Sequence, residues 1–85
     1  MAIELLYFAW VREAIGTGSE RVDPPAGIAT VADLVDWLAD RGGGYATAFA
    51  DRQRLRAAVD QAFVTMDATI LGAREVALFP PVTGG

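Results

Sequence analysis

The chain has 85 residues, of which 53% are hydrophobic and 21% are charged, so we expect one small folded domain and not a disordered segment. It has no Cys and no His, and all seven basic residues are Arg, which excludes disulfides, zinc ribbons, thiol or histidine catalysis and Schiff-base chemistry. The net charge of −4 disfavours binding to nucleic acid or anionic membranes and favours a protein partner with a basic surface.

The N-terminus has no basic segment followed by a long apolar run, as a signal peptide would have. No stretch approaches the roughly 20 apolar residues that a membrane-spanning helix needs. We therefore expect a cytoplasmic protein.

The first part of the chain predicts two strands around a short helix. An apolar run rich in β-formers covers residues 3–9, and residues 11–15 can form at most two helical turns before Gly16. Residues 20–23 resemble a short polar edge strand, which Pro24 and Pro25 would close.

The main helix is predicted to begin after Thr30, which forms a capping-box pattern with Asp33. Apolar residues then recur with the i, i+3, i+4, i+7 spacing of one helical face: Val31, Leu34, Val35 and Leu38. We expect this helix to end at glycines 42–44, because a left-handed C-cap costs glycine little.

The second half predicts a short helix followed by strands. Residues 45–51 suggest a weakly patterned helix, and residues 55–59 and 62–66 are β-like runs followed by a turn at 67–69. A last strand covers residues 74–79 and is stopped by two prolines. The first and last strands are the most apolar, so we place them side by side at the centre of a mixed sheet. The predicted fold class is α+β, with one main helix across one face.

Strand alternation points to an aromatic patch on the other face of the sheet. Alternate residues of a strand point to the same face of a sheet. By this rule, polar residues share a face with three aromatic residues, whereas the core positions lie on the other face. The polar residues are Glu4, Gln61 and Glu75, and the aromatic residues are Phe8, Phe63 and Phe79. Exposed aromatic patches commonly mark protein contacts. The alternatives are that both faces of the sheet are covered or that a bulge shifts the parity.

Two other patterns could suggest ligand sites. The acidic residues Asp33, Asp36 and Asp40 follow one side of the main helix, but a solvent-facing helix is normally charged there, so we expect no metal site. Glycines 42–44 follow a helix and lack a Walker lysine, so we interpret them as a loop and not as a phosphate cradle.

The end of the sequence suggests a carrier function. Two prolines would project the last residues away from the body of the domain, and two glycines leave the terminal carboxylate unshielded. These residues are Pro80, Pro81, Val82, Thr83, Gly84 and Gly85. A carboxylate is a poor electrophile, so its use would require activation, for example by transfer to AMP. The alternative is a frayed tail without chemistry.

The segment from Phe79 to Gly85, FPPVTGG, resembles the C-terminal signature of the small, sulfur-carrying subunits of molybdopterin synthase, a ubiquitin-like β-grasp family. The resemblance extends to residues 6–9, 11–13 and 58–61. Asp60 stands where this family usually has Asn. The resemblance implies a β-grasp domain over residues 1–79 and an extended carrier tail over residues 80–85.

The resemblance also implies a chemical role for Gly85, with Gly84 beside it. A ubiquitin-activating-type adenylyltransferase would use ATP to adenylate the Gly85 carboxylate, and a sulfurtransferase system would convert it to a thiocarboxylate. The large synthase subunit would supply the active site in which sulfur passes to cyclic pyranopterin monophosphate, within a heterotetramer. The chain itself would be a non-catalytic sulfur donor without bound cofactor or metal.

Binding to these partners would involve the aromatic patch and the lead-in to the glycines; these residues are Phe8, Phe63, Phe79, Pro80, Pro81, Val82 and Thr83. One alternative is a sulfur carrier for thiamin thiazole synthesis or tRNA thiolation on the same fold. The other is an interaction module whose tail has no chemistry.

Overall fold

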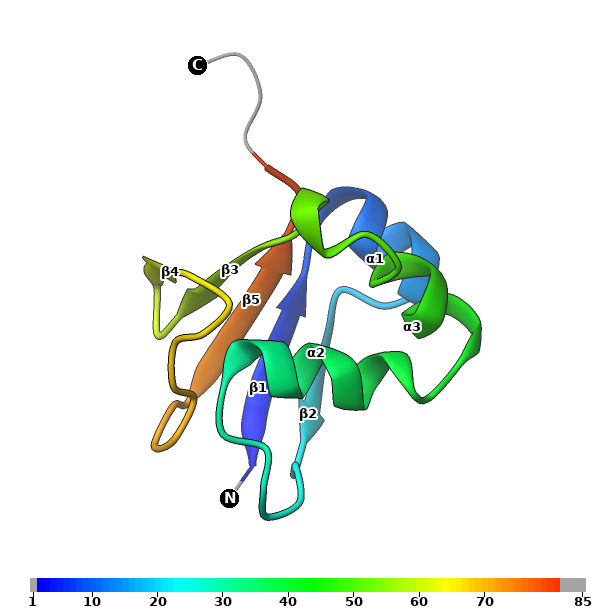
Figure 1. Cartoon of the computed structure of the whole chain (residues 1–85). Helices are drawn as coiled ribbons and strands as arrows, with labels where there is room; N and C mark the ends of the chain where they lie inside the picture. The colour runs from blue at the N-terminus through cyan, green and yellow to red at the C-terminus, as the bar shows by residue number, and fades with distance from the viewer. Residues whose placement is uncertain (1, 82–85) are drawn as a thin grey trace.

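The computed structural model of the protein describes residues 2–81 and has a sheet with helices packed on it (Figure 1). The strands are β1 (Ile3–Tyr7), β2 (Ser19–Val22), β3 (Arg56–Val59), β4 (Ala62–Val64) and β5 (Glu75–Phe79). The helices are α1 (Ala9–Ile15), α2 (Val31–Ala39), α3 (Gly43–Ala48) and the 3-10 turn η1 (Arg52–Arg54). Within residues 2–81, no helix is long and apolar enough to cross a membrane.

The five strands lie in the order β2-β1-β5-β3-β4. Strands β1 and β5 are parallel, whereas the other neighbouring pairs are antiparallel. The predictions of a mixed sheet, of an edge strand after the first helix and of adjacent first and last strands are therefore confirmed. Figure 1 shows α2 crossing in front of β1 and β2, the arrangement of a β-grasp fold.

Helix α2 begins as the capping-box pattern predicts. The Thr30 side chain accepts a hydrogen bond from the Asp33 amide, and the Asp33 carboxylate accepts one from the Thr30 amide. These bonds satisfy amides that have no partner within the helix. The four predicted apolar positions of α2 are all buried: Val31, Leu34, Val35 and Leu38. They pack in one core with the alternate positions of β1 and β5, namely Ile3, Leu5, Tyr7, Val76 and Leu78.

The prediction that glycines 42–44 form a loop that caps the main helix is wrong. Helix α2 ends at Ala39 with a right-handed C-cap residue, and Gly42 is instead the N-cap of α3. A Cβ on Gly44 would lie 2.0 Å from the carbonyl oxygen of Ala14 in α1. The glycine at this position therefore permits close packing of α3 on α1, which a reading of local propensity does not reveal.

The predicted strand over residues 62–66 ends earlier, at Val64. The chain then turns to the start of α2, where the Met66 carbonyl accepts a hydrogen bond from the Ala32 amide at 2.8 Å. The Ala68 carbonyl accepts a second bond, from the Val31 amide at 3.0 Å. This segment thus leaves the sheet and pairs with the N-terminus of the main helix.

Glu20 on the edge strand connects the sheet to the helical layer. Its carboxylate accepts hydrogen bonds from the Tyr7 hydroxyl at 2.8 Å and the Tyr45 hydroxyl at 2.6 Å, and it pairs with Arg41 at 3.0 Å. Partial burial alone would raise the pKa of Glu20, but these three donors together hold it below its ordinary value. Burial, together with the bond to Glu20, raises the pKa of Tyr7 well above the ordinary value.

Glu20→Ala should lower the free energy of unfolding at neutral pH by about 1–3 kcal/mol, because it leaves the buried Tyr7 hydroxyl without its acceptor. The wild-type advantage should be largest above the ordinary carboxylate pKa of about 4.3 and shrink as the pH falls through the lowered folded-state pKa of Glu20. Denaturant titration of the wild type and the variant at several pH values measures this difference in the free energy of unfolding. The exposed Glu13→Ala is the matched control, expected to change stability by no more than about 0.5 kcal/mol. Equal stability of the two variants at neutral pH would refute the prediction.

Candidate functional site

Three phenylalanines from separate parts of the chain meet on the side of the sheet opposite to the helical core. The ring of Phe79, at the end of β5, lies 6.5 Å from that of Phe8, in an edge-to-face arrangement. It lies 5.8 Å from the ring of Phe63 in β4. The structure thus brings together the three residues whose parity the sequence singles out, and we call them the aromatic patch. Their binding role stays a prediction.

The strand register explains why these rings project from the surface. Phe63 is paired with Ala58, Ala58 with Ala77, and Ala77 with Leu6, so small side chains occupy the middle of this face. Side chains of directly paired residues point to the same side of a sheet. Phe63 is 82% exposed and Phe8 is 48% exposed, values that are unusual for large apolar side chains unless something covers them.

The aromatic patch lies where the chain leaves the sheet. Phe79 is the last residue of β5 and is followed directly by Pro80 and Pro81, which are partly buried. The four remaining predicted site residues, Val82, Thr83, Gly84 and Gly85, lie outside the described residues. A partner bound to the patch would therefore contact the start of this terminal segment.

Arg56 borders the aromatic patch, a neighbour that strand alternation does not predict. It is the strand partner of Phe79, at the start of β3. A shallow cavity of about 220 Å³ lies between Arg56, Ala57, Phe63 and Phe79. Arg56 could be identified only from its position opposite the last residue of β5. That position follows from the register of β3 on β5.

Asp60 fixes the start of β5. It lies in the two-residue turn between β3 and β4, with φ angles of 49° at Asp60 and 72° at Gln61. Its carboxylate oxygen Oδ1 accepts hydrogen bonds from the amides of Arg74 at 2.9 Å and Glu75 at 3.0 Å. Asp60, which departs from the family pattern, therefore has a structural role at the start of β5.

Two of the three acidic residues on one side of the main helix have structural roles. The Asp33 carboxylate accepts bonds from the amides of Ala29 and Thr30, which hold its pKa below the ordinary value. Asp36 pairs with Arg52. The acidic side of α2 is thus used for capping and for a surface ion pair.

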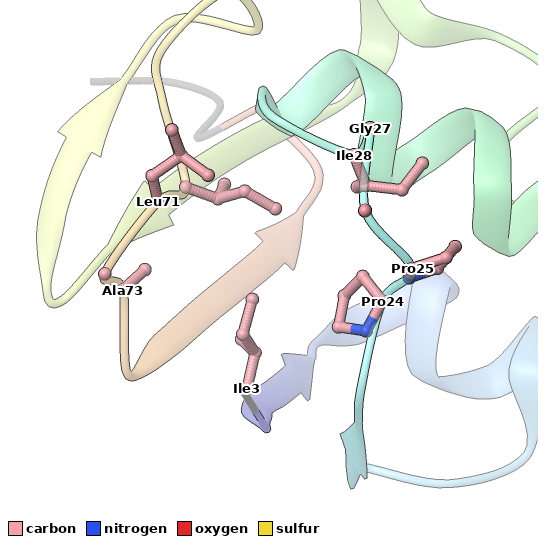
Figure 2. A pocket seen from close by; sticks show the side chains of 10 residues that line it. Ile3, Pro24, Pro25, Gly27, Ile28, Leu71 and Ala73 are labelled. Atoms are coloured by element: carbon pink, nitrogen blue, oxygen red, sulfur yellow. The ribbon is translucent and has the colours of Figure 1, made fainter.

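Another cavity lies at the opposite end of the sheet from Phe79. It has a volume of about 390 Å³ and lies beside Ile3, the first residue of β1. Figure 2 shows Pro24, Pro25 and Leu71 around its opening. None of its lining residues carries a titratable side chain, so it offers no group for acid–base chemistry.

Comparison with known proteins identifies a family that this chain matches. The ThiS family model matches residues 5–85. The molybdopterin synthase sulfur carrier subunit of Escherichia coli (strain K12) is 42% identical over 83 residues, which cover 98% of this chain and 99% of that protein.

Solved structures agree with this result. The crystal structure of SAMP1 from Haloferax volcanii superposes with a TM-score of 0.71 at 29% identity, with 100% of both chains covered. A putative molybdopterin converting factor, subunit 1, from Pyrococcus furiosus gives a TM-score of 0.71 at 26% identity and covers 96% of this chain and 99% of its own.

Proposed function

The chain belongs to the ThiS family, and we propose that it is the sulfur carrier subunit of a molybdopterin synthase. The observation that carries the proposal is the 42% identity to such a subunit over 98% of this chain. The family match also extends through the two terminal glycines. The aromatic patch at the start of the terminal segment provides a surface with which a partner could position that segment.

The composition supports a division of labour between this chain and its partners. Without Cys, His or Lys, the chain lacks the side chains that most often act as nucleophile or general base. Its contribution to the reaction is then the Gly85 carboxyl group, and the catalytic side chains belong to partner proteins. Gly84 lets this carboxyl group enter a narrow site without the steric hindrance of a Cβ.

The proposed function requires three chemical steps. An adenylyltransferase joins the Gly85 carboxylate to the AMP part of ATP and releases pyrophosphate. A sulfurtransferase system delivers sulfur at the oxidation level of sulfide, which displaces AMP and leaves a thiocarboxylate. In the large subunit, that sulfur is transferred to cyclic pyranopterin monophosphate, and water restores the carboxylate. ATP is a substrate of the activating enzyme, and this chain keeps no cofactor of its own.

Two competing functions lead to different results. A sulfur carrier for thiamin thiazole synthesis or tRNA thiolation would be loaded in the same way but would deliver sulfur to another acceptor. A pure interaction module would bind its partner without being loaded at all. The cytoplasmic location and the heterotetrameric assembly remain predictions of the same proposal.

The experiment that tests the proposal has two stages. The chain is first coexpressed with an activating enzyme and a sulfur donor, and the exchange of one oxygen for sulfur at Gly85 is measured by intact mass. The loaded protein is then mixed with the large subunit and cyclic pyranopterin monophosphate. We expect molybdopterin to form while the terminus returns to the carboxylate. Loading without any transfer to this acceptor would support a different sulfur carrier.

A further inference from the structure

Arg56 places a cation at the edge of the apolar surface on which a partner is proposed to dock. Its strand pairing with Phe79 puts both side chains on the same face, and it lines one cavity together with Phe63 and Phe79. The residue is exposed. A partner that covers Phe79 would therefore also cover the guanidinium group of Arg56.

The guanidinium group is held by the backbone and has donors left for a partner. Its Nη1 donates to the carbonyl oxygens of Gln53 at 2.8 Å and Leu55 at 2.9 Å. A guanidinium carries five N–H donors, so these two bonds do not exhaust them. Among residues 2–81, Arg56 forms no ion pair with a carboxylate, whereas Arg52 and Arg41 each do.

The positive charge of Arg56 limits which groups of a partner protein can cover it. Removing an arginine from water without an opposite charge is costly, and a carboxylate is the group that matches the planar donors of a guanidinium. Building on the proposed function, we propose that the large synthase subunit docks on the aromatic patch and presents a carboxylate to Arg56. The net charge of −4 predicts a partner with a basic surface, and the carboxylate opposite Arg56 is the local exception to that rule.

The opposite end of the same face carries acidic residues, which would give the docking a direction. Glu4 and Glu75 are paired across β1 and β5, and Arg21 lies 3.6 Å from Glu4. Glu75 and Phe79 are four positions apart at the two ends of β5, a distance of roughly 13 Å at about 3.3 Å per residue. A partner with an acidic group beside the terminal segment and a basic group over the glutamates would fit in one orientation only.

Charge reversal at Arg56 tests the inference. Binding to the large subunit encoded in the same genome is measured by titration calorimetry, at low ionic strength and without nucleotide or phosphate, so that only protein groups can pair with the arginine. Arg56→Glu should weaken binding at least about tenfold, and Arg56→Gln should weaken it less and reduce its salt dependence. Arg54→Glu is the matched control, because Arg54 is also exposed but lines a separate cavity with Trp10 and Ala50. This control should change affinity by less than about threefold.

Equal affinities of the Arg56→Glu and Arg54→Glu variants would overturn the inference. The affinity of Phe79→Ala for the large subunit, measured in the same way, tests the docking surface independently of the proposed carboxylate. If Phe79→Ala binds more weakly and Arg56→Glu binds like the wild type, the aromatic patch is a docking surface but no carboxylate of the partner lies opposite Arg56. Absence of wild-type binding would overturn the proposed function, and the inference with it.

Discussion

Adding one residue after Gly85 should abolish ATP-dependent adenylation of the chain, and Gly84→Ala should slow it by about 100-fold. The added residue places the Gly85 carbonyl in an ordinary peptide bond and moves the free carboxylate beyond the activating site. The methyl group introduced by Gly84→Ala would obstruct a narrow channel and misplace the reacting carboxyl, and small misplacements of a reacting group can cost about 100-fold in rate. The test is to measure the rate of adenylate formation on the wild type, on Gly84→Ala and on the extended chain under the same conditions.

Neither change alters residues 2–81, which contain the sheet and its core, so the free energy of unfolding should change by no more than about 0.5 kcal/mol. Gly18→Ala is a suitable control, because the atoms nearest to a Cβ there belong to the flexible Arg12 side chain, the first at 3.4 Å. This variant should be adenylated at the wild-type rate. Similar rates for the wild type, Gly84→Ala and the extended chain would mean that the terminal segment is only a linker.

Phe79→Ala should weaken binding to both the large subunit and the activating enzyme by about 30-fold or more. Phe79 contacts both other rings of the aromatic patch, so its loss removes the centre of the surface. Truncation of such an aromatic anchor commonly costs about 2 kcal/mol or more in binding, which corresponds to this factor. Titration of each partner with the variant measures the effect, and circular dichroism verifies that the sheet is intact.

Leu71→Ala provides the control for this experiment. Leu71 is also a large apolar residue, 73% exposed, but it lies at the cavity on the far end of the sheet. Its truncation should leave both affinities unchanged. Affinities of Phe79→Ala that equal those of the wild type would mean that neither partner binds at the aromatic patch.

The parts of the fold that follow from local periodicity could be predicted from the sequence. Alternation in β1 and β5 separates buried Leu5 and Val76 from Glu4 and Glu75, which face the other side. The capping box fixes the start of α2 because its hydrogen bonds join residues only three positions apart. The aromatic patch could be predicted for the same reason, since each ring has a polar neighbour of the same parity.

Features that depend on contacts between distant segments could not be predicted. Gly44 belongs to a helix because it packs on Ala14, thirty residues earlier, and no local pattern indicates that contact. Arg56 borders the aromatic patch only through the register of β3 on β5. The start of α3 at Gly43, two residues before the helix predicted over residues 45–51, and the cation beside Phe79 thus both required the tertiary structure.

Sulfur on Gly85 is detected by the mass of the intact chain recovered from cells with an active cofactor pathway. We expect a fraction of molecules in which one oxygen is replaced by sulfur, and fragmentation should place the exchange at Gly85. The chain extended by one residue, prepared in the same way, should show no exchange. Wild-type protein that never gains sulfur while the activating enzyme and the sulfur donor are both working would contradict the proposal that Gly85 carries sulfur.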